Sequence, residues 1–312
     1  MYLSKMTFNT SEIPSAQRKS ASKTIVSASA DAEEILPPLE DKPRILIESL
    51  EAGVRLELGE LWVYRELLYF LTLRDIKVRY KQTLMGAAWV IIQPLGTMLI
   101  LTLFFNKLAG LQSGQIPYPL FAYSGLLLWT FFSNAVVNST NSLVSNTNLI
   151  TKVYFPRMFI PIAAVGAGLV DLAIASIVLI GLAIYYQVPF GWKILTLPIF
   201  ISLAVGLAIA VGMLISALTV KYRDLKHALP FIIQAWMFAS PVIYPPGIVP
   251  EKWRWLLNLN PLSGIIEGFR SALIGRAFDW PAIGAAAAIT SALLLCSVYV
   301  FRRTEDTFAD LI

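Results

Sequence analysis

Residues 158–186 read MFIPIAAVGAGLVDLAIASIVLIGLAIYY, a run in which Asp171 is the single charged side chain. At about 1.5 Å of rise per residue, a helix of about 20 apolar residues is long enough to cross about 30 Å of hydrocarbon. Comparable runs recur along the 312 residues, of which 56% are hydrophobic and 14% are charged. A soluble domain of this length could not keep that composition in water. The sequence therefore predicts an all-α polytopic membrane protein.

Six transmembrane helices are predicted from these runs. Their ranges are 84–106, 118–140, 158–186, 194–219, 229–244 and 281–301. The fifth is short because it is closed by Ser240-Pro241 and Tyr244-Pro245-Pro246, where proline lacks an amide donor and fixes φ.

The segment 249–275 predicts a re-entrant helical hairpin on the outer side. Asn260 suits the N-cap of its second helix, and Pro261 suits the first helical position. About fifteen residues at 1.5 Å each give roughly 22 Å, which is too short to cross. Glu267 and Arg270 stand at i and i+3, so they can pair on one face. Non-spanning backbone at membrane depth is tolerated only where it is buried in protein or lines a cavity.

The N-terminal part divides at about residue 57. Residues 1–57 are polar and interrupted by prolines, which predicts a flexible cytoplasmic tail. Residues 58–82 predict an interfacial amphipathic helix, because apolar residues recur at helical spacing beside a basic stripe. The apolar set is Leu61, Tyr64, Leu68 and Leu71, and the basic set is Arg74, Lys77 and Lys81. Such a helix lies in the headgroup region, either as an ordinary juxtamembrane anchor or as a functional gate.

The distribution of Lys and Arg predicts the orientation. Basic residues cluster at 74–81, 152–157, 221–226 and 302–303, which all lie inside if the N-terminus is cytoplasmic. The two short outer loops carry only Lys107 and Lys193. Because short cytoplasmic loops hold an excess of positive charge, both termini are predicted to be cytoplasmic, as an even number of spans requires.

Several functions are excluded by missing motifs. The chain has no G-x-x-x-x-G-K-[ST] motif, so it is not predicted to hydrolyse ATP itself. One cysteine, Cys296, and one histidine, His227, leave no metal-ligand cluster. The net charge of +5 is explained by membrane orientation better than by nucleic acid. We predict no catalytic residues, no metal and no cofactor in this chain, and no nucleic-acid partner.

The inner loop 141–157 predicts a short helix at the cytoplasmic surface. Asn146 or Thr147 can cap this helix, and Pro156 limits it. The loop then presents apolar and aromatic residues where polar ones are usual. It therefore predicts either a docked partner or a helix that lies in the headgroup region.

Aromatic residues in two spans are candidates for a channel lining. Sugars are held by aromatic faces together with groups that bond hydroxyls, so the candidates are Tyr123, Trp129, Phe132, Trp236 and Phe238. Helix packing is the alternative role for these side chains.

Asp171 is the one carboxylate deep in a predicted span. An intramembrane ionisable group is a functional candidate by default. A proton-coupled carrier usually has several such groups, so a neutral or hydrogen-bonded packing role is the other interpretation.

Four motifs in order resemble type-2 ABC exporter permeases, and among these the polysaccharide, O-antigen and teichoic-acid export branch. They are Arg74-Asp75-Ile76-Lys77-Val78-Arg79-Tyr80-Lys81 with Gly86-Ala87-Ala88-Trp89 and Gln93-Pro94, then Lys152-Val153-Tyr154-Phe155-Pro156-Arg157, Tyr222-Arg223-Asp224, and Asn260-Pro261-Leu262 with Glu267-Gly268-Phe269-Arg270. The resemblance covers the chain from Leu58 to its C-terminus.

The resemblance implies a homodimeric permease of the bacterial inner membrane, with two separate ATPase subunits that hold ATP and Mg. It implies a gate helix over 61–80, a coupling helix over 146–155 and an outer gate over 249–275. The expected substrate is a lipid-linked glycan; the alternatives are a small hydrophobic drug or lipid, or a proton-coupled secondary transporter. The implied gate residues are Arg74, Asp75, Lys77, Arg79 and Tyr80; the coupling residues are Asn146, Lys152, Tyr154, Phe155, Pro156 and Arg157; the outer-gate residues are Asn260, Pro261, Glu267 and Arg270.

Overall fold

The computed structural model describes residues 64–81, 86, 88–108, 116–153, 155–189, 191–305 and 308, all within one compact unit. The predicted tail over 1–57 and the first part of the predicted interfacial helix lie outside these residues. Every regular element in the described ranges is helical. The prediction of an all-α fold is confirmed for this part of the chain.

Five helical stretches are long and apolar enough to cross a membrane. They are Ala88–Phe105, Tyr118–Ser145, Phe159–Tyr185, Trp192–Lys221 and Trp280–Glu305. The first contains α4 (Ala88–Leu101) and the start of a wider π-helical segment (Thr102–Leu108), and the fourth joins a short 3₁₀ helix (Trp192–Thr196) to α8 (Leu197–Lys221). The other three are α5 (Tyr118–Ser145), α7 (Phe159–Tyr185) and α12 (Trp280–Glu305).

The predicted fifth span, 229–244, corresponds to α9 (Leu225–Ala239), which is shorter than a full crossing. Its 15 residues cover roughly 22 Å. The helix ends before Pro241, and residues 240–245 continue as turns and irregular backbone. Length and composition therefore give five spans rather than the predicted six, because the prolines stop α9 early.

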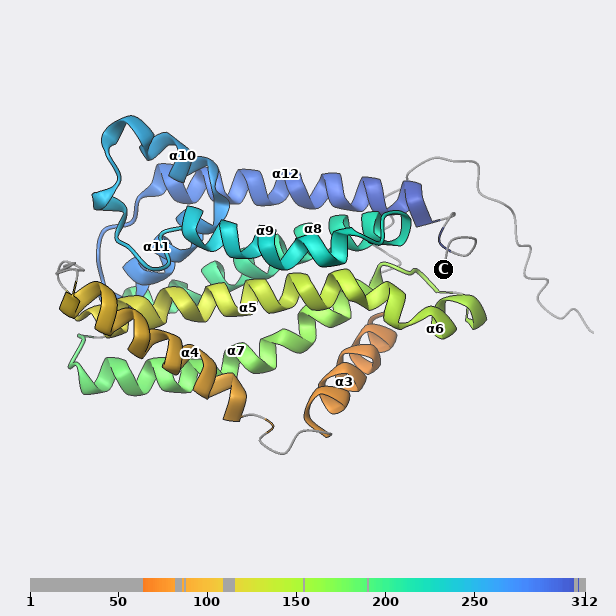
Figure 1. Cartoon of the computed structure of the whole chain (residues 1–312), viewed down its shortest axis with the longest axis horizontal. Coiled ribbons are helices and arrows are strands. Elements are labelled where there is room, and N and C mark those ends of the chain that lie inside the picture. Colours follow the sequence, from red (N-terminus) through yellow and green to blue (C-terminus); the bar gives the residue numbers. More distant parts are fainter. Residues whose placement is uncertain are drawn as a thin grey trace, which may run out of the picture. The chain divides into compact units, whose positions relative to one another are not determined.

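α5 is the central helix of the bundle. It packs against both α7 and α8, while α12 packs on the far side of α8 (Figure 1). In its most apolar stretch 78% of α5 is buried, against 17–33% in the other four spans. A Cβ at Gly212 of α8 would collide with Ser139 of α5, so glycine lets these two backbones approach closely.

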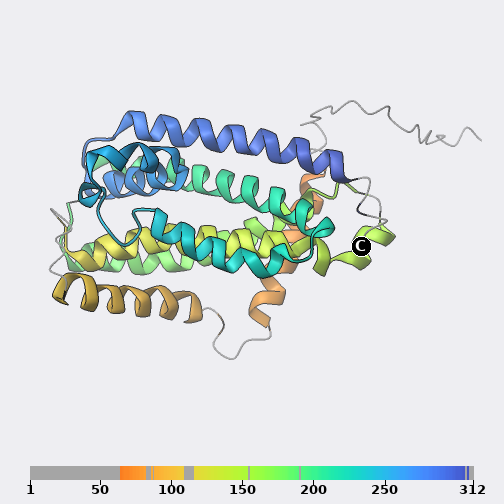
Figure 2. The same cartoon turned by 45° about the horizontal axis from the view of Figure 1, so that its top comes forward.

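The two ends of the bundle carry different elements. One end holds α6 (Thr147–Lys152), the start of α9 and the end of α12 (Figures 1 and 2). The opposite end holds α10 (Arg254–Leu259) and α11 (Pro261–Ile274), separated at Asn260 within the predicted re-entrant segment. We call these the α6 end and the α11 end.

α3 (Arg65–Lys81) runs across the bundle axis instead of along it (Figures 1 and 2). It packs on α7, with Leu71 buried and Thr72 against Gly166. Tyr69 and Phe70 are exposed, as is Lys77, so apolar and basic side chains are not separated onto two faces as predicted. The reason is that α7 covers part of α3, which gives this helix two apolar surfaces.

Candidate functional site

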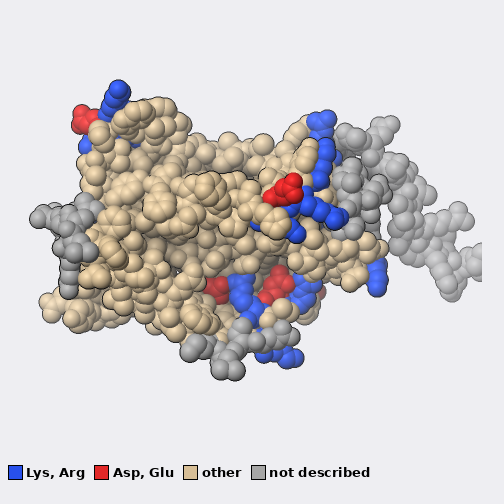
Figure 3. Space-filling view, in the orientation of Figure 1, with Lys and Arg blue, Asp and Glu red and all other residues tan. Residues whose placement is uncertain are grey.

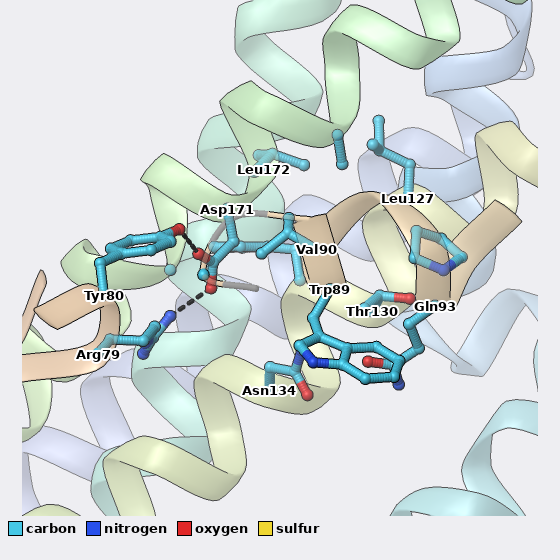
Figure 4. A pocket seen from close by; sticks show the side chains of 15 residues that line it. Arg79, Tyr80, Trp89, Val90, Gln93, Leu127, Thr130, Asn134, Asp171 and Leu172 are labelled. Atoms are coloured by element: carbon cyan, nitrogen blue, oxygen red, sulfur yellow. Dashed lines mark hydrogen bonds and ion pairs between the residues drawn. The ribbon is translucent and has the colours of Figure 1, made fainter. Parts of the chain in front are cut away.

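A pocket lies where the end of α3 meets α4, α5 and α7. Its volume is about 230 Å³, and its lining combines apolar side chains with Trp89 and Gln93 from α4 and Thr130 and Asn134 from α5 (Figure 4). Each of these two pairs is spaced i, i+4, so both side chains of a pair stand on one face of their helix. Asp171 of α7 also lines the pocket.

Asp171 is bound by two side chains of α3. The Arg79 guanidinium forms an ion pair with one carboxylate oxygen, and the Tyr80 hydroxyl donates a hydrogen bond to the other (Figure 4). Figure 3 shows acidic and basic atoms interleaved in this region, and Arg74 and Asp75 pair next to it at 2.8 Å. The pairing satisfies a charge that α7 would otherwise carry alone among apolar residues.

Tyr80 acts here as a hydrogen-bond donor. Burial, followed by the hydrogen bond to Asp171, raises the pKa of the Tyr80 hydroxyl to about 12. The phenol therefore keeps its proton at neutral pH. The contact ties the end of α3 to the middle of α7.

At the α6 end, Asn146 does not cap the short helix as predicted. It occupies the N-cap position, but its amide donates back to the Ser142 carbonyl at 2.8 Å. Thr147 likewise donates to the Val144 carbonyl at 2.8 Å. Both side chains thus satisfy the last carbonyls of α5, which a helix end leaves without amide partners.

Phe155 is buried and belongs to a second hydrophobic cluster at this end. The cluster joins the inner loop to Leu71 of α3, Phe159 of α7 and Phe301 of α12. Phe155, one of the implied coupling residues, therefore packs within its own chain instead of standing exposed on the loop. Tyr154, its predicted companion, lies outside the described residues.

Arg157 fixes the same loop to the end of α12. Its backbone amide donates to the Glu305 carboxylate at 2.8 Å, and its guanidinium donates to the Glu305 carbonyl. Pro156 is half-buried beside it, whereas Lys152 and Val153 are exposed. The exposed residues next to Tyr154 are thus those just before it, and Ser145 and Asn148 are exposed further back in the loop.

At the α11 end, Arg270 is buried with 3% of its side chain exposed. It donates to the Glu267 carboxylate at 2.7 Å, so the predicted i, i+3 pair is present. It also donates to the carbonyls of Phe121, Pro241 and Val242 at 3.0, 2.6 and 2.8 Å. Its guanidinium therefore joins α11, the start of α5 and the irregular backbone after α9.

Asn260 caps α11 as predicted. Its carbonyl oxygen accepts from the Leu262 amide at 3.1 Å, and Pro261 occupies the first helical position. The same oxygen accepts a hydrogen bond from the Trp236 indole at 3.1 Å. The side-chain amide of Asn260 donates to the Ser240 hydroxyl at 2.8 Å. The cap residue thus also holds the end of α9.

The channel candidates on α5 are core residues. Tyr123 and Phe132 are fully buried, Trp129 is almost so, and the Tyr123 hydroxyl donates to the Ala175 carbonyl at 2.9 Å. These side chains pack against neighbouring helices because α5 is covered on most of its sides. In a single copy of the chain, they therefore have the helix-packing role that was the alternative to a channel lining. On α9, Trp236 is half-buried against Phe132 and Phe238 is exposed.

Sequence reasoning missed the pocket as a unit. Trp89, Gln93 and Thr130 were not singled out for it, although the i, i+4 spacing of Trp89 with Gln93 and of Thr130 with Asn134 was visible in the sequence. Glu305 was also missed, and no local signal relates it to Arg157 across 148 positions. Among the described residues, no group of three His, Cys, Asp or Glu could hold a metal ion.

Apolar helices of spanning length, packed around a buried central helix, define a multi-pass membrane protein. The chain belongs to the ABC-2 type transporter family, whose pattern it matches over residues 66–274.

Named relatives cover most of the chain. The O-antigen export system permease protein RfbA of Myxococcus xanthus is 29% identical over 257 residues, which are 80% of this chain and 97% of that protein. A protein of the same name from Klebsiella pneumoniae is 27% identical, over 79% of this chain and 95% of its own length. The polysialic acid transport protein KpsM of Escherichia coli is 24% identical, over 76% and 92% respectively.

Proposed function

We propose that this chain is the membrane-spanning permease subunit of an ATP-driven ABC exporter that moves a lipid-linked polysaccharide outward across the bacterial inner membrane. The observation that carries the proposal is the similarity to O-antigen export permeases along 80% of the chain. Similarity to a polysialic acid transport protein supports the same substrate class. The motif for nucleotide binding is missing from the sequence, so ATP and Mg are assigned to a separate ATPase subunit.

The proposed topology has six crossings, with both termini cytoplasmic. α9 and residues 240–245 lead the chain from the α6 end to the α11 end, which supports a sixth crossing made of a short helix and irregular backbone (Figure 1). Because this backbone is held by Arg270 and Asn260, its carbonyls find partners inside the protein, as the membrane requires. The α6 end is then cytoplasmic and the α11 end is outer.

The proposed coupling site is the surface of α6 and the residues just after it. Thr151, Lys152 and Val153 are exposed there, so they are available to an ATPase subunit. Behind them, the cluster around Phe155 reaches Leu71 of α3. Movement of the loop would therefore displace α3, the proposed gate helix, through packed side chains.

The proposed assembly is two copies of this chain with two ATPase subunits. α9 supports a second copy, because Phe231 and Phe238 are exposed on a helix that packs mainly on α5 and α8 among the described elements. Phe238 remains a channel candidate in such a dimer.

Purification of the tagged chain in mild detergent, with the mass of the intact complex, tests this assembly. We expect a P-loop ATPase at two plus two and loss of a surface glycan when the chain is depleted. Isolation of the chain alone, with transport that follows a pH gradient, would contradict the proposal and favour the secondary transporter.

A further inference from the structure

Four polar side chains in the pocket have no hydrogen-bond partner in the part of the chain that the structure describes. The indole NH of Trp89, the amides of Gln93 and Asn134, and the hydroxyl of Thr130 make no hydrogen bond among the described residues. Trp89, Gln93 and Asn134 are exposed, and Thr130 is half-buried. All four stand in helices of membrane-spanning character, where most side chains are apolar. They are therefore available to a ligand.

The pocket carries no net charge among the described residues that line it. Arg79 and Asp171 are its charged members, and they pair with each other. The Tyr80 hydroxyl is bound to the same carboxylate and keeps its proton. An anionic phosphate would therefore have to compete with Asp171 for Arg79, whereas an uncharged ligand meets no such obstacle.

The chemistry of the lining matches a sugar ring. In Figure 4 the Trp89 ring and the amides of Gln93 and Asn134 lie on one side of the pocket, and the Asp171 carboxylate lies on the other. An indole face packs against the C–H groups of a pyranose, while amides and a hydroxyl bond its OH groups. A volume of about 230 Å³ is sufficient for one such ring.

The pocket lies at the beginning of α4 but well inside α5 and α7. Asn134 lies about 17 Å before the end of α5, and Asp171 lies about 18 Å after the start of α7, at 1.5 Å per residue. α4 begins at Ala88, next to Trp89. If α4 crosses the hydrocarbon, the pocket lies at its inner edge, beside α3.

We infer that this pocket binds one uncharged sugar ring, the membrane-proximal residue of the lipid-linked glycan. Trp89 stacks on the ring, and Gln93, Thr130 and Asn134 bond its hydroxyls. The inference rests on the proposed function and adds to it a recognition site within a single subunit.

Protection of an introduced thiol tests the site. Cys296, the single cysteine, is first replaced by alanine, and Thr130→Cys then places a small thiol in the pocket. Asn141→Cys is the control, since Asn141 is exposed on the same helix and does not line the pocket. Inverted membrane vesicles holding the full chain are labelled with a methanethiosulfonate reagent, with octyl glucoside or octyl phosphate added below the concentrations that dissolve the membrane.

Octyl glucoside at ten times its half-protecting concentration is expected to slow labelling of Thr130→Cys about ten-fold and to leave Asn141→Cys unchanged. Adding Trp89→Ala should raise the half-protecting concentration about ten-fold, while Trp89→Phe keeps most of the protection. Vesicles from cells that cannot make the glycan should label faster before any glucoside is added, which identifies the glycan as the natural occupant.

Three results would overturn the inference: no protection by octyl glucoside, equal protection by octyl phosphate, or equal slowing at Asn141→Cys. Depletion of the chain tests the proposed function separately. If depletion of the chain abolishes the surface glycan but octyl glucoside does not protect the thiol, the proposed sugar site is refuted and the proposed function is retained. If octyl glucoside protects the thiol but depletion of the chain leaves the surface glycan unchanged, the proposed function is refuted. The assignment of the pocket to the exported glycan is then refuted as well.

Discussion

Replacing Arg270 with methionine should destabilise the permease strongly, because the guanidinium serves several acceptors at once. Three of them are the backbone carbonyls of Phe121, Pro241 and Val242, at 2.6–3.0 Å. An unsatisfied buried acceptor costs about 1–3 kcal/mol, and breaking a buried ion pair costs about 3–5 kcal/mol. Glu267 keeps 29% of its side chain exposed, so water can stabilise it after the change. We therefore expect a loss of about 3–5 kcal/mol, the lower part of the combined range.

A matched control is present in the same chain. Arg254 and Glu251 have the same i, i+3 spacing, but they lie 3.4 Å apart with 51% and 88% of their side chains exposed. Arg254→Met should change the free energy of unfolding by no more than about 0.5 kcal/mol. The two substitutions remove the same side chain from the same kind of pair, so their difference reports burial and the backbone contacts.

Thermal unfolding of the purified protein in detergent measures both variants. The expected fall in Tm is on the order of 10 °C for Arg270→Met and about 1–2 °C or less for Arg254→Met. If Arg270→Met does not accumulate, Arg270→Lys, which keeps the charge but offers fewer donors in a fixed plane, should give an intermediate Tm. Equal Tm values for Arg270→Met and Arg254→Met would refute the reasoning.

Three further predictions concern the other contacts. Gly125→Ala should lower Tm in the same assay, since an added Cβ would meet the Arg270 guanidinium and lie 2.8 Å from the Val242 carbonyl; an unchanged Tm would mean that this junction can expand. Asp171→Asn should lower the yield of folded protein more than export per folded complex, since it breaks the ion pair with α3; normal assembly without export would make Asp171 a functional group. Phe155→Ala removes a buried aromatic ring, so it should lower the free energy of unfolding by about 3–5 kcal/mol and reduce the yield. Val153→Asp, at an exposed position, should leave the yield intact and reduce the amount of ATPase that co-purifies. The reverse pattern would place the docking surface at Phe155.

Local signals predicted the helices and the cap of α11 well. Apolar runs define spans whatever the neighbours are, and the Asn260-Pro261 start of α11 is a property of adjacent residues. The pair Glu267–Arg270 followed from helical spacing in the same way. These features could be read from the sequence because each is decided within a few residues.

Features that depend on tertiary packing could not be predicted in this way. Tyr123 and Phe132 were candidates for a channel, because an aromatic residue in a span looks the same whether it faces a lumen or a core. Asp171 finds Arg79 and Tyr80 more than 90 positions away, and nothing in the sequence names them as partners. The end of α9 at Ala239 could not be predicted to the residue, because it depends on where the backbone hydrogen bonds of the helix stop before Pro241.

The central position of α5 has a consequence for biogenesis. It has the lowest mean hydropathy of the five spans, 1.5 against 1.9–2.6, and its apolar window is the most enclosed by protein. α5 leaves the ribosome before α7 and α8, which later cover it. During synthesis α5, the least hydrophobic span, is therefore in the bilayer before α7 and α8 are made, and Ser139 and Thr140 are not yet covered by protein. We therefore expect a chain stopped before α8 to be degraded faster in the membrane than a chain that includes α8.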